Sequence, residues 1–499
     1  MKIEKIFDRC IKFLSLIMLL WIILLLVFFE NKIDYSAKRG FLLSNFVIVI
    51  IGLSLIIIQK FLKFKIKEIN YDKIVKILCP IFLVVQIYIF YHTYFETGWD
   101  PRLLISNARS IINGQGVVSL DYYSMYPNNI LYTLIAALIL KINSFFGLFG
   151  NDYDLISIVF INCIISSFSS YLVYKIGKQL FDKRIAFFGY IVAVLLFVFS
   201  PWNIICYSDS FSIFIPILIL YIYINKKIKY YYKFPLIVLL SYLGFSIKPH
   251  TVIIAIAIVI IEIIKCISNI NKNKIKKFGI ISIISITIVL NINTSLNILY
   301  SKKGFILNEE AKFGYMHFLM MGSNWERNGI YYAPDVDFSA KQRTTKIRNE
   351  QNFKVFIKRI KSYGVDGYYY FLSKKILTLY NDGSYAWMGE GDFFAGLKPE
   401  TTKISKPLRE IYYGDNYKYY STTMQFIWIN VLLIIFINSV IVFFKKQKID
   451  YIYLVVLLSI IGITLFELLF EVRARYLYTS VPIFIVLMMY GLNNITKKT

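Results

Sequence analysis

Residues 74–102 read IVKILCPIFLVVQIYIFYHTYFETGWDPR, an apolar run from Ile74 to Tyr94 that gives way to a polar segment containing Asp100. About 20 apolar residues are the length that an α-helix needs to cross a bilayer. A carboxylate at the water end of such a helix is not needed for packing. It is where an enzyme acting at the membrane face on a lipid-linked substrate would keep its general base. The alternative is that Asp100 only caps the helix that follows.

The composition is that of a polytopic membrane protein. Of the 499 residues, 57% are hydrophobic, and the mean hydropathy of +0.59 is too high for a soluble domain of this size. The formal net charge is +26, but the lysines lie in short loops between apolar runs, a distribution that orients membrane helices. The charge therefore does not indicate a nucleic acid partner. The five cysteines include no CxxC pair, so they predict neither a disulfide framework nor a zinc site.

Charge also decides the topology. The predicted crossings lie near residues 11–29, 41–58, 74–94, 153–174, 185–202, 210–225, 234–247, 251–265, 278–300, 424–444, 451–470 and 477–493. A further apolar stretch, Ile130 to Leu140, is too short for a crossing and suits an interfacial helix. If it does not cross, all the lysine-rich loops fall inside; if it does, those after residue 150 fall outside. We therefore predict twelve crossings with both termini inside.

The predicted fold is an all-α polytopic membrane protein with a smaller external segment of α or α+β structure. Its predicted parts are an N-terminal hairpin (1–60), a catalytic transmembrane module (61–300) with external juxtamembrane helices over 95–150, an extracytoplasmic domain (301–423) and C-terminal membrane helices (424–499). Within the extracytoplasmic domain, Gln351–Ser362 and Tyr368–Leu379 predict two helices.

This topology gathers charged residues on the external face. They are Glu96, Asp100, Asp209, Lys248, His250, Glu471, Arg473 and Arg475. A single charged side chain at a helix end often only extends so that its charge lies at the membrane–water interface. Carboxylates and several cations on one face are less easily explained in that way, and they indicate a site.

Short motifs that contain these residues follow one another in a fixed order. They are Gly98-Trp99-Asp100, Tyr126-Pro127, Pro201…Tyr207-Ser208-Asp209, Ile247-Lys248-Pro249, His317…Gly322…Gly329…Tyr331 and Glu471-Val472-Arg473-Ala474-Arg475-Tyr476. In this order they resemble the GT-C glycosyltransferases, specifically the protein O-mannosyltransferase and aminoarabinose transferase group and its Gram-positive relatives. The resemblance covers roughly residues 74–493. The N-terminal hairpin is extra, and Asn128-Asn129 replaces a basic residue of the aminoarabinose transferases.

The resemblance implies a GT-C-like fold and an inverting transfer of a sugar from a polyprenyl-phosphate carrier. The acceptor would be an extracytoplasmic glycan, lipid or protein, and membrane lipids would surround the enzyme. Such a transfer needs a base for the acceptor hydroxyl and cations for the phosphate that leaves. The candidates are Asp100, Asp209 and Glu96 for catalysis; Lys248, Arg473, Arg475 and His250 for the donor phosphate; and Tyr126, Asn128 and His317 for acceptor or sugar.

Several alternatives stay open at this point. Asp209 suits binding of sugar hydroxyls, orientation of the acceptor, or ligation of a divalent metal together with Asp100. His250 and His317 each also fit a structural role. Two other functions compete with the transferase: a flippase or carrier for lipid-linked saccharide, and a polysaccharide polymerase or ligase. The expected location is the cell membrane, with the active site on the extracytoplasmic face.

Overall fold

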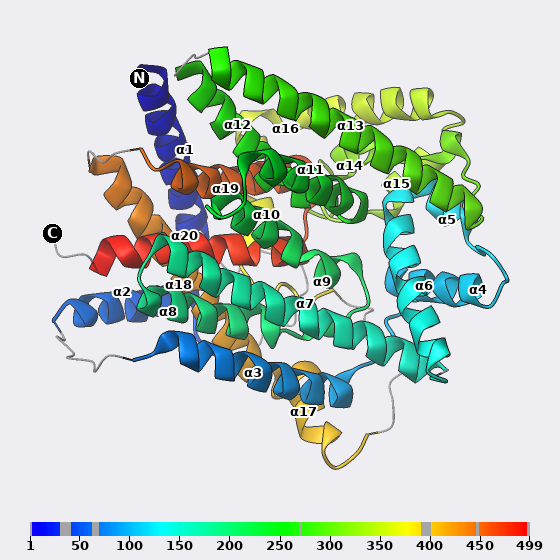
Figure 1. The fold of residues 1–499 in the computed structure, drawn as a ribbon, viewed down its shortest axis with the longest axis horizontal. Helices are drawn as coiled ribbons and strands as arrows, with labels where there is room; N and C mark the ends of the chain where they lie inside the picture. Colours follow the sequence, from blue (N-terminus) through cyan, green and yellow to red (C-terminus); the bar gives the residue numbers. More distant parts are fainter. Residues whose placement is uncertain are drawn as a thin grey trace.

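The computed structural model describes residues 2–29, 41–61, 69–148, 150–268, 272–390, 401–445 and 449–496. Regular structure in these residues is helical, with no strand (Figure 1). The all-α prediction is therefore confirmed, and of the two options for the segment 301–423 the described part is α. Two of the predicted basic loops, near residues 60–67 and 445–448, fall largely outside the described residues.

Every predicted crossing contains a helix, although in the stretch predicted at 185–202 the α-helix ends at Ala193. These helices are α1 Lys2–Phe28, α2 Asn45–Phe61, α3 Tyr71–Thr93, α7 Asn151–Leu180, α8 Lys183–Ala193, α10 Phe214–Ile224, α11 Tyr230–Ile247, α12 Ile253–Ser268, α13 Lys272–Lys302, α18 Tyr417–Phe444, α19 Tyr451–Leu469 and α20 Val481–Thr496. In the described part of the chain, nine helices are long and apolar enough to cross a membrane, and Asn45–Ile58 and Ser208–Ile224 are shorter apolar helices. The chain is thus a multi-pass membrane protein.

The remaining helices are shorter or lie between the apolar runs. They are α4 Asp100–Ile112, α5 Leu120–Met125, α6 Ile130–Phe145, α9 Ser208–Ser212, α14 Tyr315–Met321, α15 Ala333–Ala340, α16 Thr345–Tyr380 and α17 Ser405–Tyr413, with the short turns η1 Pro127–Asn129, η2 Val194–Val198, η3 Pro201–Ile204, η4 Pro249–Val252, η5 Glu309–Ala311 and η7 Ala474–Ser480. Both helices predicted in the segment 301–423 fall within α16. They are separated by a break at Gly364, whose φ of 63° is left-handed.

The helix α6 is longer than its apolar stretch suggests. With η1 it runs over Pro127–Phe145 and is one of the nine helices long enough to cross. In Figure 1, however, α6 runs across the direction of α3 and α7 instead of alongside them, and it packs on α4. That orientation favours the interfacial placement. The count of twelve crossings stays a prediction.

The helix ends predicted to be cytoplasmic meet one another in two ion-pair clusters. Asp72 of α3 bonds Lys178 of α7 at 2.5 Å and Lys183 of α8 at 2.7 Å. In the second cluster, Glu262 of α12 accepts hydrogen bonds from Lys265 at 2.6 Å and from the Tyr223 hydroxyl of α10 at 2.7 Å. Basic groups thus gather at one end of the bundle, called the basic end below.

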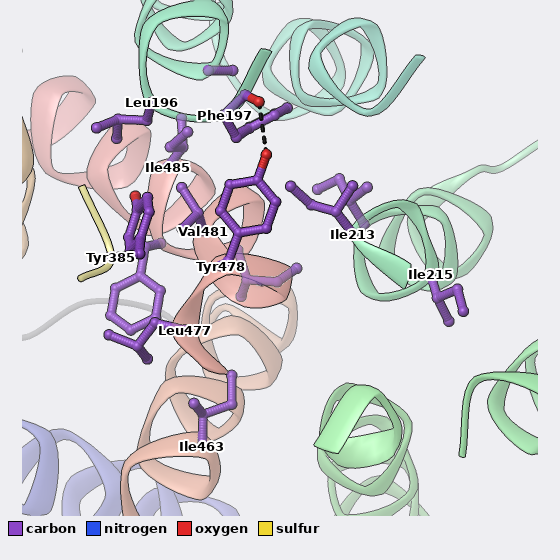
Figure 2. Packing of buried hydrophobic residues seen from close by; sticks show 14 of the residues in the cluster. Leu196, Phe197, Ile213, Ile215, Tyr385, Ile463, Leu477, Tyr478, Val481 and Ile485 are labelled. Atoms are coloured by element: carbon purple, nitrogen blue, oxygen red, sulfur yellow. Dashed lines mark hydrogen bonds between the residues drawn. The ribbon is translucent and has the colours of Figure 1, made fainter. Parts of the chain in front are cut away.

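Buried apolar side chains of η7 and the start of α20 pack closely against neighbouring helices (Figure 2). Helix α8 passes into the π turn η2, and the last carbonyl groups of that turn have no partner within the helix. Side chains satisfy them: Tyr478 and Asn203 donate to the Phe197 carbonyl oxygen at 2.8 and 2.7 Å, and Gln86 donates to that of Val198 at 2.6 Å. This fixes the segment that leads from η2 into α9.

Candidate functional site

Four chain connections meet at the end of the bundle opposite the basic end. They are the start of α4 with Asp100, the start of α9 with Asp209, the turn between α11 and η4 with Lys248, and the turn between α19 and η7 with Arg475. Pro249 keeps the residue before it extended, at φ −149° and ψ 104°, and so ends α11 at Ile247. The sequence placed these four residues on one face, and the described structure brings their side chains together.

Asp209 and Lys248 form a buried ion pair. Lys248 Nζ lies 2.8 Å from Asp209 Oδ1, and the two side chains are 11% and 2% exposed. The ammonium group also lies 4.5 Å from the ring centroid of Tyr476. The second carboxylate oxygen, Oδ2, accepts no hydrogen bond from any described residue. Because its charge is matched and it is enclosed, Asp209 orients Lys248 and retains one free acceptor.

Asp100 stands in a different environment at the first turn of α4. The Tyr207 hydroxyl donates a hydrogen bond to Asp100 Oδ2 at 3.2 Å, and the Tyr122 hydroxyl also faces this carboxylate. Burial raises the pKa of the Asp100 carboxyl above its ordinary value of 3.8, while Arg475 and the two hydroxyls act in the lowering direction. Asp100 as a whole residue is half-buried. Its surroundings thus differ from those of the enclosed, cation-paired Asp209.

Arg475 interacts electrostatically with both Asp100 and Asp209. Its guanidinium carbon is 4.2 Å from the ring centroid of Trp99 and 5.9 Å from that of Tyr207. Its terminal nitrogen is 3.8 Å from Glu390, and its Nε has no hydrogen-bond partner among the described residues. A stacked guanidinium with a free donor is suited to planar contacts with phosphate oxygens.

Arg473 is held differently. It donates to Glu471 at 2.9 Å and to Glu390, so two carboxylates already face its charge. An anionic ligand would have to compete with Glu390 for this arginine. Of the two arginines predicted to bind phosphate, Arg475 is the one whose Nε is buried without a hydrogen-bond partner among the described residues.

Aromatic rings connect the charged groups. Tyr207 touches three of them: it donates to Asp100, and its ring lies within 6 Å of both Lys248 and Arg475. Tyr207, Tyr122, Trp99, Tyr476 and Glu390 were not among the predicted site residues. Three of these five lie beside predicted residues in the quoted motifs, which was the available signal. Glu390 had none, because it meets Arg473 only through the fold.

Three predicted residues point elsewhere. Glu96 lies 3.7 Å from both Arg102 and Arg109, beside a small cavity near Cys206. His317 is buried in α14, where its Nδ1 lies 2.7 Å from the Ser339 hydroxyl, and burial lowers its pKa to about 4. The printed contact of the Asn128 side chain is with its neighbour, at 3.4 Å. None of these contacts joins the charges around Tyr207.

Tyr126 and His250 border the site. The Tyr126 ring packs on Phe313 with 5.3 Å between the ring centroids. The Tyr126 hydroxyl also interacts electrostatically with Asp100. His250 is buried, with Nε2 2.6 Å from the Thr479 hydroxyl and Nδ1 3.8 Å from Glu467. His250 thus ties η4 to η7 through Thr479.

Gly322, Gly329 and Lys375 form a junction that supports the turn carrying both arginines. A Cβ at Gly322 would lie 2.3 Å from the Phe470 carbonyl carbon, and the Val472 amide donates to the Gly329 carbonyl oxygen at 3.0 Å. Lys375 of α16 is fully buried and donates to the carbonyl oxygens of Gly322, Leu468 and Phe470 at 2.6 to 2.8 Å. The segment 301–423 thereby positions the residues just before Arg473.

The donor set of the site is suited to anions more than to a metal. No group of three or more His, Cys, Asp or Glu side chains arranged to hold a metal ion occurs within the described residues. At the centre, each of the two aspartates has a cation or hydroxyl donors of the protein facing it.

Comparison with known proteins identifies one family. No curated protein matches the chain. A family model described as "Conserved hypothetical integral membrane protein" matches residues 3–496, nearly the whole length. This chain therefore belongs to that family, CHIM_prot, of integral membrane proteins.

Proposed function

We propose that this protein is an inverting glycosyltransferase that moves a sugar from a polyprenyl-phosphate carrier to an acceptor at the external face of the cell membrane. One observation carries the proposal: a partly exposed carboxylate, Asp100, and two cations, Lys248 and Arg475, surround the Tyr207 ring at one end of a membrane bundle. A base and a phosphate site within reach of each other at a membrane face are what such a transfer requires.

The reaction follows from these positions. Asp100 removes the proton of the acceptor hydroxyl as its oxygen attacks the anomeric carbon from the face opposite the phosphate. The bond between that carbon and the phosphate oxygen breaks, and its electron pair leaves with the lipid phosphate, which becomes a dianion. Arg475 and Lys248 stabilise the new charge. Asp209 holds Lys248 in place, and its free oxygen Oδ2 is available to a sugar hydroxyl.

A transfer assay tests the proposal. The purified protein would be given radiolabelled polyprenyl-phosphate sugars from a panel, together with candidate glycan, lipid and peptide acceptors. We expect transfer from one donor. Asp100→Asn should lower the rate by roughly 10²- to 10⁴-fold, the usual contribution of a general base. The matched control is Asp121→Asn, an exposed aspartate of the nearby α5, which should retain the wild-type rate.

Two outcomes would contradict the proposal. An Asp100→Asn variant with more than a tenth of wild-type activity would remove Asp100 from the base role. Failure of every donor in the transfer assay, combined with movement of a labelled lipid-linked saccharide across vesicles that contain the protein, would identify a carrier instead.

A further inference from the structure

Helix α13 is the least enclosed of the candidate membrane spans in the described residues. Only 6% of the apolar window in Gly279–Lys302 is buried, compared with 17% or more in the other spans. Its neighbour is α11, where the Tyr242 hydroxyl donates to Asn293 Oδ1 at 2.7 Å. In Figure 1, α13 lies along the upper edge of the molecule. Most of its surface therefore faces the surroundings of the protein.

A regular row of exposed residues runs along α13 on the side away from Asn293. The row is Ile280, Ile284, Thr287, Asn291, Thr294 and Ile298, and all six are exposed. Their spacing alternates between four and three residues, which is the a/d pattern of two helices that pack as a left-handed coiled coil. The middle of the row is polar, which is unusual for a surface that meets lipid.

Asn291 is the residue that requires a partner. It lies 11 residues before Lys302, or roughly 16 Å along the helix, which is near the middle of a hydrocarbon layer about 30 Å thick. One of its amide hydrogens is donated to the Thr287 carbonyl oxygen at 2.8 Å. The other N–H and the side-chain oxygen have no partner among the described residues. An amide left in this state in lipid is costly, because no water is present to bond it.

The flanking threonines need no such partner. The Thr287 and Thr294 hydroxyls donate to carbonyl oxygens one turn back in the same helix, at 3.0 and 2.9 Å. They leave small side chains one turn on either side of Asn291, so another helix can approach closely there.

We propose that α13 pairs with α13 of a second copy of this chain across a two-fold axis along the membrane normal. Two copies share one orientation in the membrane, so the two helices run parallel and equivalent residues face each other. Asn291 then meets Asn291, and each side-chain oxygen accepts the remaining N–H of the other. Asn291 is the one amide in the row, and a single amide at such a position also fixes the register. The proposal is independent of the transferase function.

Cysteine cross-linking in membranes tests the geometry. In a background without the five native cysteines, Thr287→Cys, Thr294→Cys and Ile298→Cys should each form disulfide-linked dimers under mild oxidation. Ile286→Cys and Leu299→Cys are matched controls, because both side chains are exposed but lie off the row. They should remain monomeric. Equal cross-linking on and off the row, or none on the row, would overturn the proposal.

The role of the amide is tested by the strength of association. Single-molecule photobleaching of labelled protein in vesicles of increasing dilution gives the fraction of dimer. Asn291→Leu should weaken association about tenfold, whereas Asn291→Gln, which keeps the amide, should retain it. At a dilution at which all three proteins are monomeric, both variants should keep the wild-type melting temperature, because Asn291 lies outside the core. A wild-type protein that stays monomeric at every density, or that pairs through α13 with a different protein, would contradict the pairing of two copies.

Discussion

At the scale of single residues, the two aspartates of the site stand in contrasting environments. Asp209 is enclosed and neutralised by Lys248, whereas Asp100 is partly exposed and contacts neutral hydroxyls. Carboxylates whose surroundings differ in this way usually divide the work of a site between them. The contrast assigns proton transfer to Asp100 and orientation of the cation to Asp209 in the proposed reaction.

The pH dependence of the proposed transfer should report Asp100. A general base acts when deprotonated, so activity is lost as pH falls through its pKa, which burial raises above 3.8. The Tyr207 hydroxyl lowers this pKa, so Tyr207→Phe should move the acid limb of kcat/KM to higher pH while keeping the ring. Tyr476→Phe is the control, because no hydrogen bond from Tyr476 to Asp100 is recorded in the described structure. An acid limb that Tyr207→Phe leaves in place would mean that another group titrates.

Donor binding should depend more on Arg475 than on Arg473. A polyprenyl phosphate that binds the folded state raises the melting temperature in detergent. Arg475→Ala should weaken binding roughly 10- to 100-fold, the value of a charged hydrogen bond. Glu390→Gln should strengthen binding by releasing Arg473 from a competing carboxylate. Arg102→Ala, at an exposed arginine beside Glu96, is the control. If the loss for Arg473→Ala exceeds that for Arg475→Ala, the phosphate lies on the other side of Glu390.

At the scale of helices, the site depends on a contact between elements far apart in the chain. Lys375 of α16 caps the end of α19 by bonding the carbonyl oxygens of Leu468 and Phe470. Burial lowers the pKa of Lys375 to about 7, and the charges of Glu467 and Glu471 act in the raising direction. The segment 301–423 therefore supports the turn before Arg473 from the side.

Loss of the Lys375 contacts should destabilise the fold and weaken the site together. Lys375→Met keeps the length of the side chain but leaves three buried carbonyl groups unbonded. The expected cost is about 3 to 5 kcal/mol, as for other broken buried polar contacts. Lys374→Met, next to it and partly exposed, should change stability by less than about 0.5 kcal/mol. Thermal unfolding in detergent measures both. Equal effects would show that the junction is not a source of stability.

At the scale of the whole molecule, the two ends of the bundle differ in chemistry. The basic end pairs lysines with Asp72 and Glu262, and the other end holds the aspartates, arginines and tyrosines of the site. Because basic loops face the cytoplasm in membrane proteins, this difference predicts that the site faces outward.

Labelling of single cysteines tests this orientation. In a cysteine-free background, Gly98→Cys and Glu326→Cys should react with an impermeant maleimide on intact cells, because both positions are exposed at the site end. Gln179→Cys and Lys227→Cys, exposed at the basic end, should react only after the membrane is opened. Labelling of Gln179→Cys from outside would require α6 to cross the membrane, and the twelve-crossing topology would be wrong.

The sequence by itself determined the class and the helices. Each predicted crossing contains a helix because the length and apolarity of a run are local properties, and they decide whether a segment suits a bilayer. It also placed Asp100, Asp209, Lys248 and Arg475 on one face, since alternate helix ends share a side. It underestimated α6, whose helix continues past the apolar stretch to Phe145.

Only the tertiary structure decided which of these residues act together. Arg473 meets Glu390, 83 residues away, and Tyr207 meets Asp100 across 107 residues. The same packing turned His317 toward Ser339 and Glu96 toward Arg102. Pairings of this kind depend on how loops and helix ends fold over one another, because a charged or polar side chain takes the nearest partner that packing leaves available. A local sequence pattern does not indicate which distant residue that partner will be.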